Sequence, residues 1–153
     1  MKVISITQER DDVQRLLNES DLYMQALYPD ESNHMLSLSH LLNESTDLIG
    51  VIVEDELAGI GAVKRLKSGD VYGEIKRVFV PEKHRGKGLS KCIMNALHQR
   101  LIDSGISEAK LETGIYQAEA IGLYKALGYL ECEPFGEYQL DPLSIFMAKT
   151  LTK

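Results

Sequence analysis

The hydrophobic positions of the chain follow a helical period in some segments and form short strand-like runs in others. Apolar residues three or four positions apart predict helices, and short apolar runs between turn residues predict strands. The predicted strands cover residues 2–7, 47–53, 57–66, 71–80, 109–113 and 144–150. The predicted helices cover residues 11–27, 31–42, 89–102 and 118–127. This succession predicts an α/β fold, in which one mixed sheet carries helices on its faces.

The predicted helix over residues 89–102 has the clearest apolar stripe. Its apolar residues fall largely on one helical face: Leu89, Cys92, Ile93, Ala96, Leu97, Leu101 and Ile102. Gly105 supplies a stop after this helix, and Gly128 closes the next one. Because Cys92 lies within the stripe, we expect it in the core rather than acting as a nucleophile. A tight acidic turn at residues 54–56 joins two of the predicted strands.

The composition predicts one globular domain and narrows the classes of partner. At 153 residues the chain suits a single domain over residues 1–153, with 44% apolar and 26% charged residues. A formal charge of −6 disfavours nucleic acid and anionic membranes as partners, and no apolar run is long enough to cross a bilayer. Neither a secretion signal nor metal-type cysteine spacing is present, so we expect a cytoplasmic protein without a metal.

The most informative segment is the turn His84-Arg85-Gly86-Lys87-Gly88-Leu89-Ser90-Lys91, between a predicted strand and a predicted helix. Backbone amides at such a helix start are free and lie at the positive end of the helix dipole, which suits a phosphate or pyrophosphate. Gly86 and Gly88 allow a ligand to approach the backbone closely. Arg85, Lys87 and Lys91 add local positive charge to an otherwise acidic chain.

Other interpretations of the glycine pair make different predictions. A Gly-x-Gly pair can mark a tight turn without a ligand. A dinucleotide-binding fingerprint requires a third glycine at position 91, which is Lys91. A Walker-type loop requires four residues between its first glycine and Gly-Lys-Ser/Thr, and this spacing is absent.

The turn also resembles a known motif. Arg85-x-x-Gly88-x-Ser90 is similar to the coenzyme A pyrophosphate signature Gln/Arg-x-x-Gly-x-Gly/Ala of the GNAT superfamily of N-acetyltransferases. Ser90 departs from that pattern conservatively, since it is small and keeps a free amide. The resemblance spans residues 71–129 and continues through Leu111-Glu112-Thr113-Gly114, Ala120-Ile121-Gly122-Leu123-Tyr124 and Gly128-Tyr129.

The flanking segments resemble one bacterial subgroup of the same superfamily. They are Leu27-Tyr28-Pro29-x-Glu31-Ser32-x-His34, Phe135-Gly136-x-Tyr138 and Asp141-Pro142-Leu143-Ser144-x-Phe146-Met147. Some members of this subgroup are labelled indole-acetic-acid acetyltransferases. A carboxylic acid is a poor acetyl acceptor, so an amine is the expected acceptor here.

The resemblance implies a GNAT-like fold with a mostly antiparallel mixed sheet, and an acyltransferase that uses acetyl-CoA. It implies that the backbone from Val78 to Val80 pairs with the pantetheine arm and that the Val78 amide binds the thioester carbonyl. The coenzyme-binding residues that it implies are Val78, Phe79, Val80, Arg85, Gly86, Lys87, Gly88, Leu89, Ser90, Lys91, Gln117 and Tyr124. Homodimers are common in the superfamily, which makes a homodimer a further expectation.

Two residues are candidates for proton transfer. Glu74 lies on the strand before the turn, where relatives often carry the general base that an aliphatic amine needs at neutral pH. Glu74 could instead be a solvated strand residue or pair with Lys76, two positions along on the same face. The resemblance places Tyr124 near the coenzyme sulfur as the acid for the departing thiolate. Tyr124 could instead pack at helical spacing with Ala120, Ile121 and Leu127.

The segment between the first two predicted helices is the candidate acceptor site, because in relatives it closes over the acceptor. The predicted substrate contacts are Tyr28, Glu31 and His34, although Asp30 or Ser32 could simply cap a helix there. We expect His40, His84 and His98 to be surface or structural residues. The loop with Phe135, Gly136, Tyr138 and Asp141 could form a wall of the acceptor pocket or a dimer contact.

The leading hypothesis is direct attack of a small amine on bound acetyl-CoA, without a covalent enzyme intermediate. A protein or peptide amine is an alternative acceptor. A second hypothesis is a module that binds acetyl-CoA as a sensor and has lost the chemistry. A third is a phosphate or nucleotide binder, which predicts tight binding of ADP without pantetheine.

Overall fold

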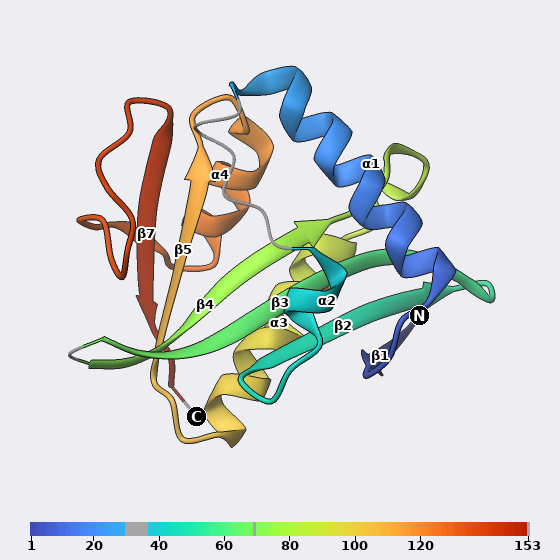
Figure 1. Cartoon of the computed structure of the whole chain (residues 1–153), viewed down its shortest axis with the longest axis horizontal. Helices are drawn as coiled ribbons and strands as arrows, with labels where there is room; N and C mark the ends of the chain where they lie inside the picture. The colour runs from blue at the N-terminus through green and yellow to red at the C-terminus, as the bar shows by residue number, and fades with distance from the viewer. Residues whose placement is uncertain (30–36, 69, 153) are drawn as a thin grey trace.

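A seven-stranded sheet flanked by helices forms the frame of the protein (Figure 1). The computed structural model describes residues 1–29, 37–68 and 70–152. The strands are β1 Lys2–Ile6, β2 Thr46–Val53, β3 Glu56–Ser68, β4 Asp70–Phe79, β5 Glu108–Gly114, β6 Leu130–Glu131 and β7 Ser144–Thr150. The helices are α1 Asp11–Leu27, α2 Leu38–Leu41, α3 Leu89–Asp103 and α4 Ala118–Ala126, with a 3₁₀ turn at Glu82–His84.

The strand order is β1-β2-β3-β4-β5-β7-β6, and every neighbouring pair is antiparallel except β4 and β5. This confirms the predicted mixed, mostly antiparallel sheet. The parallel pair is short, since only Gly73–Ile75 of β4 pairs with Ala109–Leu111 of β5. Beyond that point the two strands diverge (Figure 1). The end of β4 therefore has backbone groups that β5 does not use.

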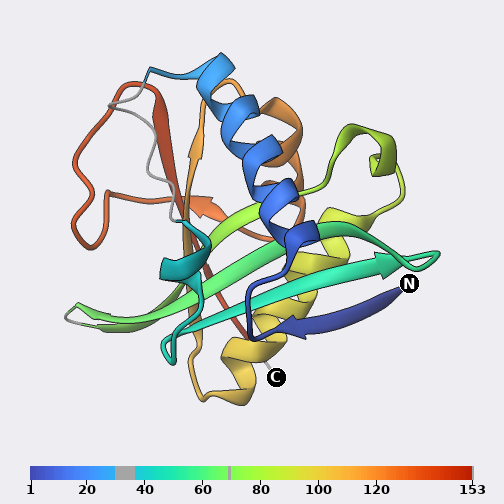
Figure 2. The same cartoon turned by 45° about the vertical axis from the view of Figure 1, so that its right-hand side comes forward.

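Alternation along the strands sends apolar side chains to both faces of the sheet. Ile49 and Val63 join the core under α3 and α4, whereas their neighbours Leu48 and Ala62 join the core under α1 and α2. Figure 2 shows α1 in front of the sheet and α3 behind it. Burial of these faces is the main term that stabilises the fold. Cys92 packs at the edge of the α3 core, as predicted.

A β-bulge interrupts β4 where it leaves β5. The register passes from Ala62↔Lys76 to Ile60↔Phe79, so β4 carries one residue more than β3. Arg77 in this bulge has φ +58°, a conformation that costs a non-glycine residue about 1–3 kcal/mol. Its buried guanidinium donates to Asp21 Oδ1 at 2.7 Å and to the Leu17 carbonyl oxygen at 3.2 Å. These contacts bind the bulge to α1.

The second predicted helix is only partly observed. Residues 30–36 lie outside the described residues, Ser37 is extended, and α2 covers only Leu38–Leu41. The prediction of helix at 37 and 42 is therefore wrong. The Asn43 side-chain amide donates to the His40 carbonyl oxygen at 2.6 Å and competes with a continuing helical bond. The acidic turn is confirmed, with φ of +50° at Glu54 and +62° at Asp55, as a two-residue hairpin turn requires.

Of the three histidines expected at the surface or in structural roles, one is exposed and two are buried. His40 is exposed, whereas His84 and His98 are buried. His98 Nε2 lies 2.6 Å from the Tyr129 hydroxyl. Burial lowers the pKa of His98 to about 4, so its imidazole is neutral at physiological pH. His98 therefore holds α3 to the segment after α4 and has no part in the site.

Candidate active site

The glycine turn between β4 and α3 forms an open cradle. Gly86 and Gly88 have φ of +79° and +75°, which few other residues adopt easily. A Cβ atom added at either glycine would meet no atom within 4 Å, so the turn faces open space. Gly88 precedes α3, and the amides of Leu89, Ser90 and Lys91 are the helix donors without an intrahelical acceptor. Free amides, helix dipole and an open approach together suit a pyrophosphate.

Arg85 stabilises this turn through a hydrogen bond and also lines the cleft in front of it. Its Nε donates to the Val80 carbonyl oxygen at 2.9 Å. Its guanidinium lies over the rings of Tyr23 at 5.5 Å and Phe79 at 6.0 Å. These contacts hold a positive charge against the cleft next to the glycines.

A cleft of about 510 Å³ runs from the turn along β4 to α4. Every predicted coenzyme-binding residue lines it except Lys87: Val78, Phe79, Val80, Arg85, Gly86, Gly88, Leu89, Ser90, Lys91, Gln117 and Tyr124. The cleft is therefore cationic at the turn and has unused β4 backbone along its side. That combination fits a ligand with a diphosphate and an amide-bearing arm.

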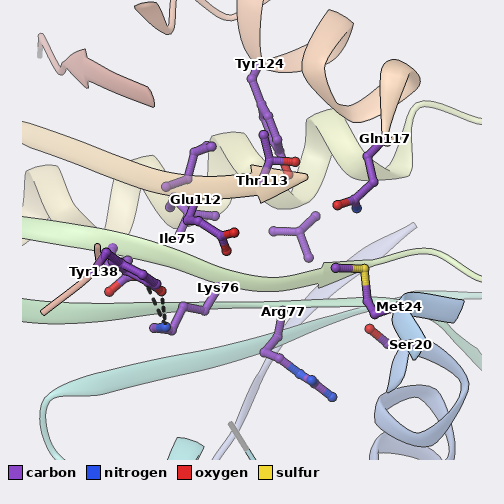
Figure 3. A pocket seen from close by; sticks show the side chains of 13 residues that line it. Ser20, Met24, Ile75, Lys76, Arg77, Glu112, Thr113, Gln117, Tyr124 and Tyr138 are labelled. Carbon is purple, nitrogen blue, oxygen red and sulfur yellow. Dashed lines mark hydrogen bonds and ion pairs between the residues drawn. The ribbon is translucent and has the colours of Figure 1, made fainter. Parts of the chain in front are cut away.

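A second, smaller cavity of about 100 Å³ adjoins the cleft on the β5 side (Figure 3). Five residues line both spaces: Ser20, Met24, Val78, Gln117 and Tyr124. The cavity also has charged residues from the diverging strands, with Glu74, Lys76 and Arg77 from β4 and Glu112 from β5. A molecule in the small cavity would therefore meet the end of a molecule in the cleft.

Glu74 is buried on the wall of the small cavity, with 4% of its surface exposed. Its Oε2 atom lies 3.1 Å from Lys76 Nζ, which confirms the predicted pairing and shows that a solvated Glu74 is wrong. The Tyr138 hydroxyl donates to the same Oε2 at 2.5 Å. Among the described residues Glu74 Oε1 has no hydrogen-bond partner, and the side chain lines the small cavity. One carboxylate oxygen is thus anchored, whereas no described residue holds the other.

Tyr124 lies between the two spaces. In Figure 3 its side chain descends from α4 toward the cavity. Burial, with a smaller contribution from the Glu112 carboxylate, raises the pKa of Tyr124 to about 12. The phenol therefore keeps its proton at any physiological pH. The predicted packing is confirmed in part, because Ala120 and Leu127 border the core to which Tyr124 belongs, whereas Ile121 is not among the described residues of that core.

Gln117 and Tyr28 connect the end of α1 with the start of α4. Gln117 Oε1 accepts from the Gly114 amide at 3.1 Å and from the Tyr28 hydroxyl at 3.4 Å. The Tyr28 hydroxyl in turn accepts from the Tyr116 amide at 3.0 Å, and the two tyrosine rings stack. Tyr28 is buried and is not among the described residues that line either space. The other predicted acceptor contacts, Glu31 and His34, lie outside the described residues.

Several residues of the small cavity were not identified as site residues from the sequence. From the sequence, Lys76 is only a candidate partner of Glu74, and Tyr138 is only part of a loop that could form a wall of the acceptor pocket. The place of Glu112 near Glu74 could have been predicted from strand alternation. Glu112 lies on the same face of β5 as Lys110, and Lys110 is the register partner of Glu74. Arg77 lines the cavity because of the bulge, for which its local sequence carries no signal.

Two kinds of feature are absent from the described residues. Over residues 1–29, 37–68 and 70–152, no three His, Cys, Asp or Glu side chains are grouped so that they could hold a metal ion. Within the same part of the chain, no helix combines the length and apolarity that a membrane span needs.

Comparison with known proteins places the chain in one class. Residues 11–129 match the acetyltransferase (GNAT) family, and the chain belongs to this family. It is 38% identical over 142 residues to an IAA acetyltransferase of Azospirillum brasilense, covering 93% of this chain and 92% of the relative. It is 36% identical over 138 residues to the uncharacterised N-acetyltransferase YsnE of Bacillus subtilis (strain 168), covering 89% and 90%.

Solved structures agree with this assignment. A Klebsiella pneumoniae protein assigned as an acyl-CoA N-acyltransferase superposes with a TM-score of 0.84 at 31% identity, covering 99% of this chain and 97% of that one. The fold is also that of the PaiA N-acetyltransferase of Thermoplasma acidophilum in complex with coenzyme A, with a TM-score of 0.75, 16% identity, and coverage of 98% and 99%. The protein is therefore an acyltransferase of the GNAT family, and acetyl-CoA is its cosubstrate.

Proposed function

We propose that the protein transfers the acetyl group of acetyl-CoA to a small amine by direct attack within a ternary complex. The observation that carries this proposal is that two spaces meet at Val78 and Tyr124. The cleft fits the coenzyme and the small cavity fits the reacting end of an acceptor. With donor and acceptor held side by side, no covalent enzyme intermediate is needed, and their orientation lowers the barrier.

The acceptor nitrogen attacks the thioester carbonyl carbon, so that a C–N bond forms and the C–S bond breaks. Glu74 Oε1 takes the proton that the nitrogen loses, and the Tyr124 hydroxyl gives a proton to the departing thiolate. The backbone amide of Val78 donates a hydrogen bond to the thioester oxygen as negative charge develops there. A preorganised donor of this kind contributes roughly 3 kcal/mol to transition-state stabilisation.

The charges of the small cavity favour an amine over a carboxylic acid as acceptor. Glu74 and Glu112 both line it, and its two cations already have carboxylate partners, since Lys76 pairs with Glu74 and Arg77 pairs with Asp21. Two carboxylates attract an ammonium group and repel an anionic acceptor.

The two free cysteines, Cys92 and Cys132, suit a reducing compartment, which supports a cytoplasmic location.

Initial-velocity kinetics test the ternary-complex mechanism. With a panel of primary amines and acetyl-CoA varied together, double-reciprocal plots should give lines that intersect. No acetyl group should remain on the enzyme after acetyl-CoA is added without an amine, as intact mass spectrometry can show. Parallel lines with an acetylated enzyme would instead establish a covalent intermediate. Saturable acetyl-CoA binding without turnover on any amine would favour a sensor.

Replacing Tyr124 by Phe tests the proposed acid. The substitution removes the proton donor and keeps the ring in the core, so kcat at pH 7 should fall about 10- to 100-fold. The loss is modest for acid catalysis because a thiol with a pKa of about 8.5 is a fair leaving group without help. The Kd for acetyl-CoA, measured by calorimetry, should stay within about threefold of wild type. An unchanged kcat would show that the thiolate leaves without Tyr124.

A further inference from the structure

The small cavity is bounded on one side by a loop residue whose hydroxyl contacts the proposed base. Tyr138 comes from the loop between β6 and β7, and its side chain lies next to that of Lys76 from β4 (Figure 3). Its hydroxyl donates to Glu74 Oε2 at 2.5 Å and accepts from Lys76 Nζ at 3.0 Å. Because Lys76 Nζ also lies 3.1 Å from Oε2, the three groups form a closed triangle.

This triangle lies between two apolar clusters of the sheet face that α1 covers. On one side Tyr72, Phe135 and Phe146 pack together, and the Tyr138 ring lies against Phe135 at 5.3 Å and Phe146 at 5.5 Å. On the other side is the core under α1 and α2. A buried ion pair is weak support for stability, because desolvation offsets much of its attraction. A charged triangle in this place therefore suggests a functional role.

The triangle restrains only one of the two carboxylate oxygens. Oε2 takes part in both the Tyr138 hydrogen bond and the Lys76 ion pair, whereas Oε1 has no partner among the described residues, and the side chain lines the cavity. Burial and the Glu74 charge raise the pKa of Tyr138, so its hydroxyl stays protonated and donates to the carboxylate. The Tyr138 ring is itself fixed by its aromatic neighbours. The carboxylate is thus held at Oε2 by the Tyr138 hydroxyl and the Lys76 ammonium.

We infer that Tyr138 is the positioning residue for Glu74: with Lys76 it fixes Oε2 so that Oε1 faces the acceptor nitrogen. This inference rests on the proposed role of Glu74 as base. Tyr138 does not itself exchange a proton with the acceptor. It acts through the orientation of Glu74 and by stabilising the ionised carboxylate.

Tyr138→Phe is the test, with Tyr72→Phe as the matched control. Both variants remove one hydroxyl from the same aromatic cluster, but only the Tyr138 hydroxyl touches Glu74. For Tyr138→Phe we expect kcat at pH 7 to fall about 10- to 30-fold, with the Kd for acetyl-CoA unchanged. The acidic limb of the profile of kcat/KM against pH should move upward by about one unit, because the ionised base has lost a donor. Tyr72→Phe should keep kcat within about twofold of wild type. The acidic limb of its pH profile should stay at the wild-type position.

A double variant separates positioning from general damage. In the Glu74→Gln background, Tyr138→Phe should cause no further loss of kcat, because a residue that acts through Glu74 has nothing left to act on. The inference would be overturned if the two substitutions together lowered kcat by the product of their separate effects. It would also be overturned if the acidic limb of the pH profile did not move in Tyr138→Phe alone. If Glu74→Gln is slow while Tyr138→Phe is normal, only the positioning role fails. If Glu74→Gln itself keeps full activity, the proposed base fails first.

Discussion

Gly88→Glu is expected to abolish measurable coenzyme binding. The new side chain would project into the open space in front of the α3 amides, where nothing lies within 4 Å of the added Cβ. It would occupy the site of the pyrophosphate and place a negative charge against it. Calorimetry should show the Kd for acetyl-CoA weakened at least about 100-fold, which corresponds to about 2.7 kcal/mol. Turnover should fall in parallel at any acetyl-CoA concentration below that Kd.

The chain offers a matched control for this substitution in Gly105. Gly105 has φ +78°, close to the +75° of Gly88, and an added Cβ there also meets nothing within 4 Å. It lies beyond the other end of α3, however, and lines neither the cleft nor the small cavity. Gly105→Glu therefore adds the same charge and similar backbone strain, about 1–2 kcal/mol, without reaching the ligand. It should lower the midpoint of thermal unfolding and keep the wild-type Kd.

ADP and coenzyme A as further ligands distinguish the coenzyme cleft from a simple phosphate site. The cleft continues from the turn along Val78–Val80 to α4, so the pantetheine arm should add affinity. We expect coenzyme A to bind clearly tighter than ADP. Equal affinities, both lost in Gly88→Glu, would identify a nucleotide-binding turn and remove the basis for acetyl transfer. Wild-type affinity in Gly88→Glu would show that the turn is structural.

The fold and the coenzyme cleft could largely be predicted because their signals are local. The phosphate turn is eight consecutive residues, and the α3 stripe repeats within fifteen. The β-bulge could not be predicted, since Arg77 adopts φ +58° only where its side chain reaches Asp21, 56 positions away. Asn43, whose side chain ends α2, could have signalled the early stop through its preference for backbone hydrogen bonds.

The small cavity was less predictable for the same physical reason. The Glu74-x-Lys76 pair follows from strand period, but the third member of the triangle, Tyr138, is 64 positions from Glu74. No periodicity connects a loop tyrosine with a strand carboxylate. Tyr28 was predicted to contact the substrate because of its place near the predicted acceptor segment. The structure buries it against the start of α4, where it accepts from the Tyr116 amide.

Glu74→Gln should leave coenzyme binding intact and reduce kcat at pH 7 by about 100- to 1000-fold. The carboxamide keeps the size of the side chain but cannot take a proton from the amine. Activity should rise again toward high pH, since an aliphatic amine with a pKa of about 10.4 then loses its proton to solvent. Rate measurements between pH 6 and 10, with one amine saturating, check both expectations. Wild-type turnover at pH 7 would exclude Glu74 as the base.

A slow Glu74→Gln enzyme has a second possible cause, because the substitution also removes the carboxylate that pairs with Lys76. Lys76 is largely buried, so an unpaired ammonium there could disturb the cavity on its own. The double variant Glu74→Gln/Lys76→Met removes both charges and restores a neutral wall. If the loss came from the stranded ammonium, the double variant should recover most of its activity. If Glu74 is the base, the double variant should stay as slow as Glu74→Gln at pH 7 and regain its rate only where the amine deprotonates unaided.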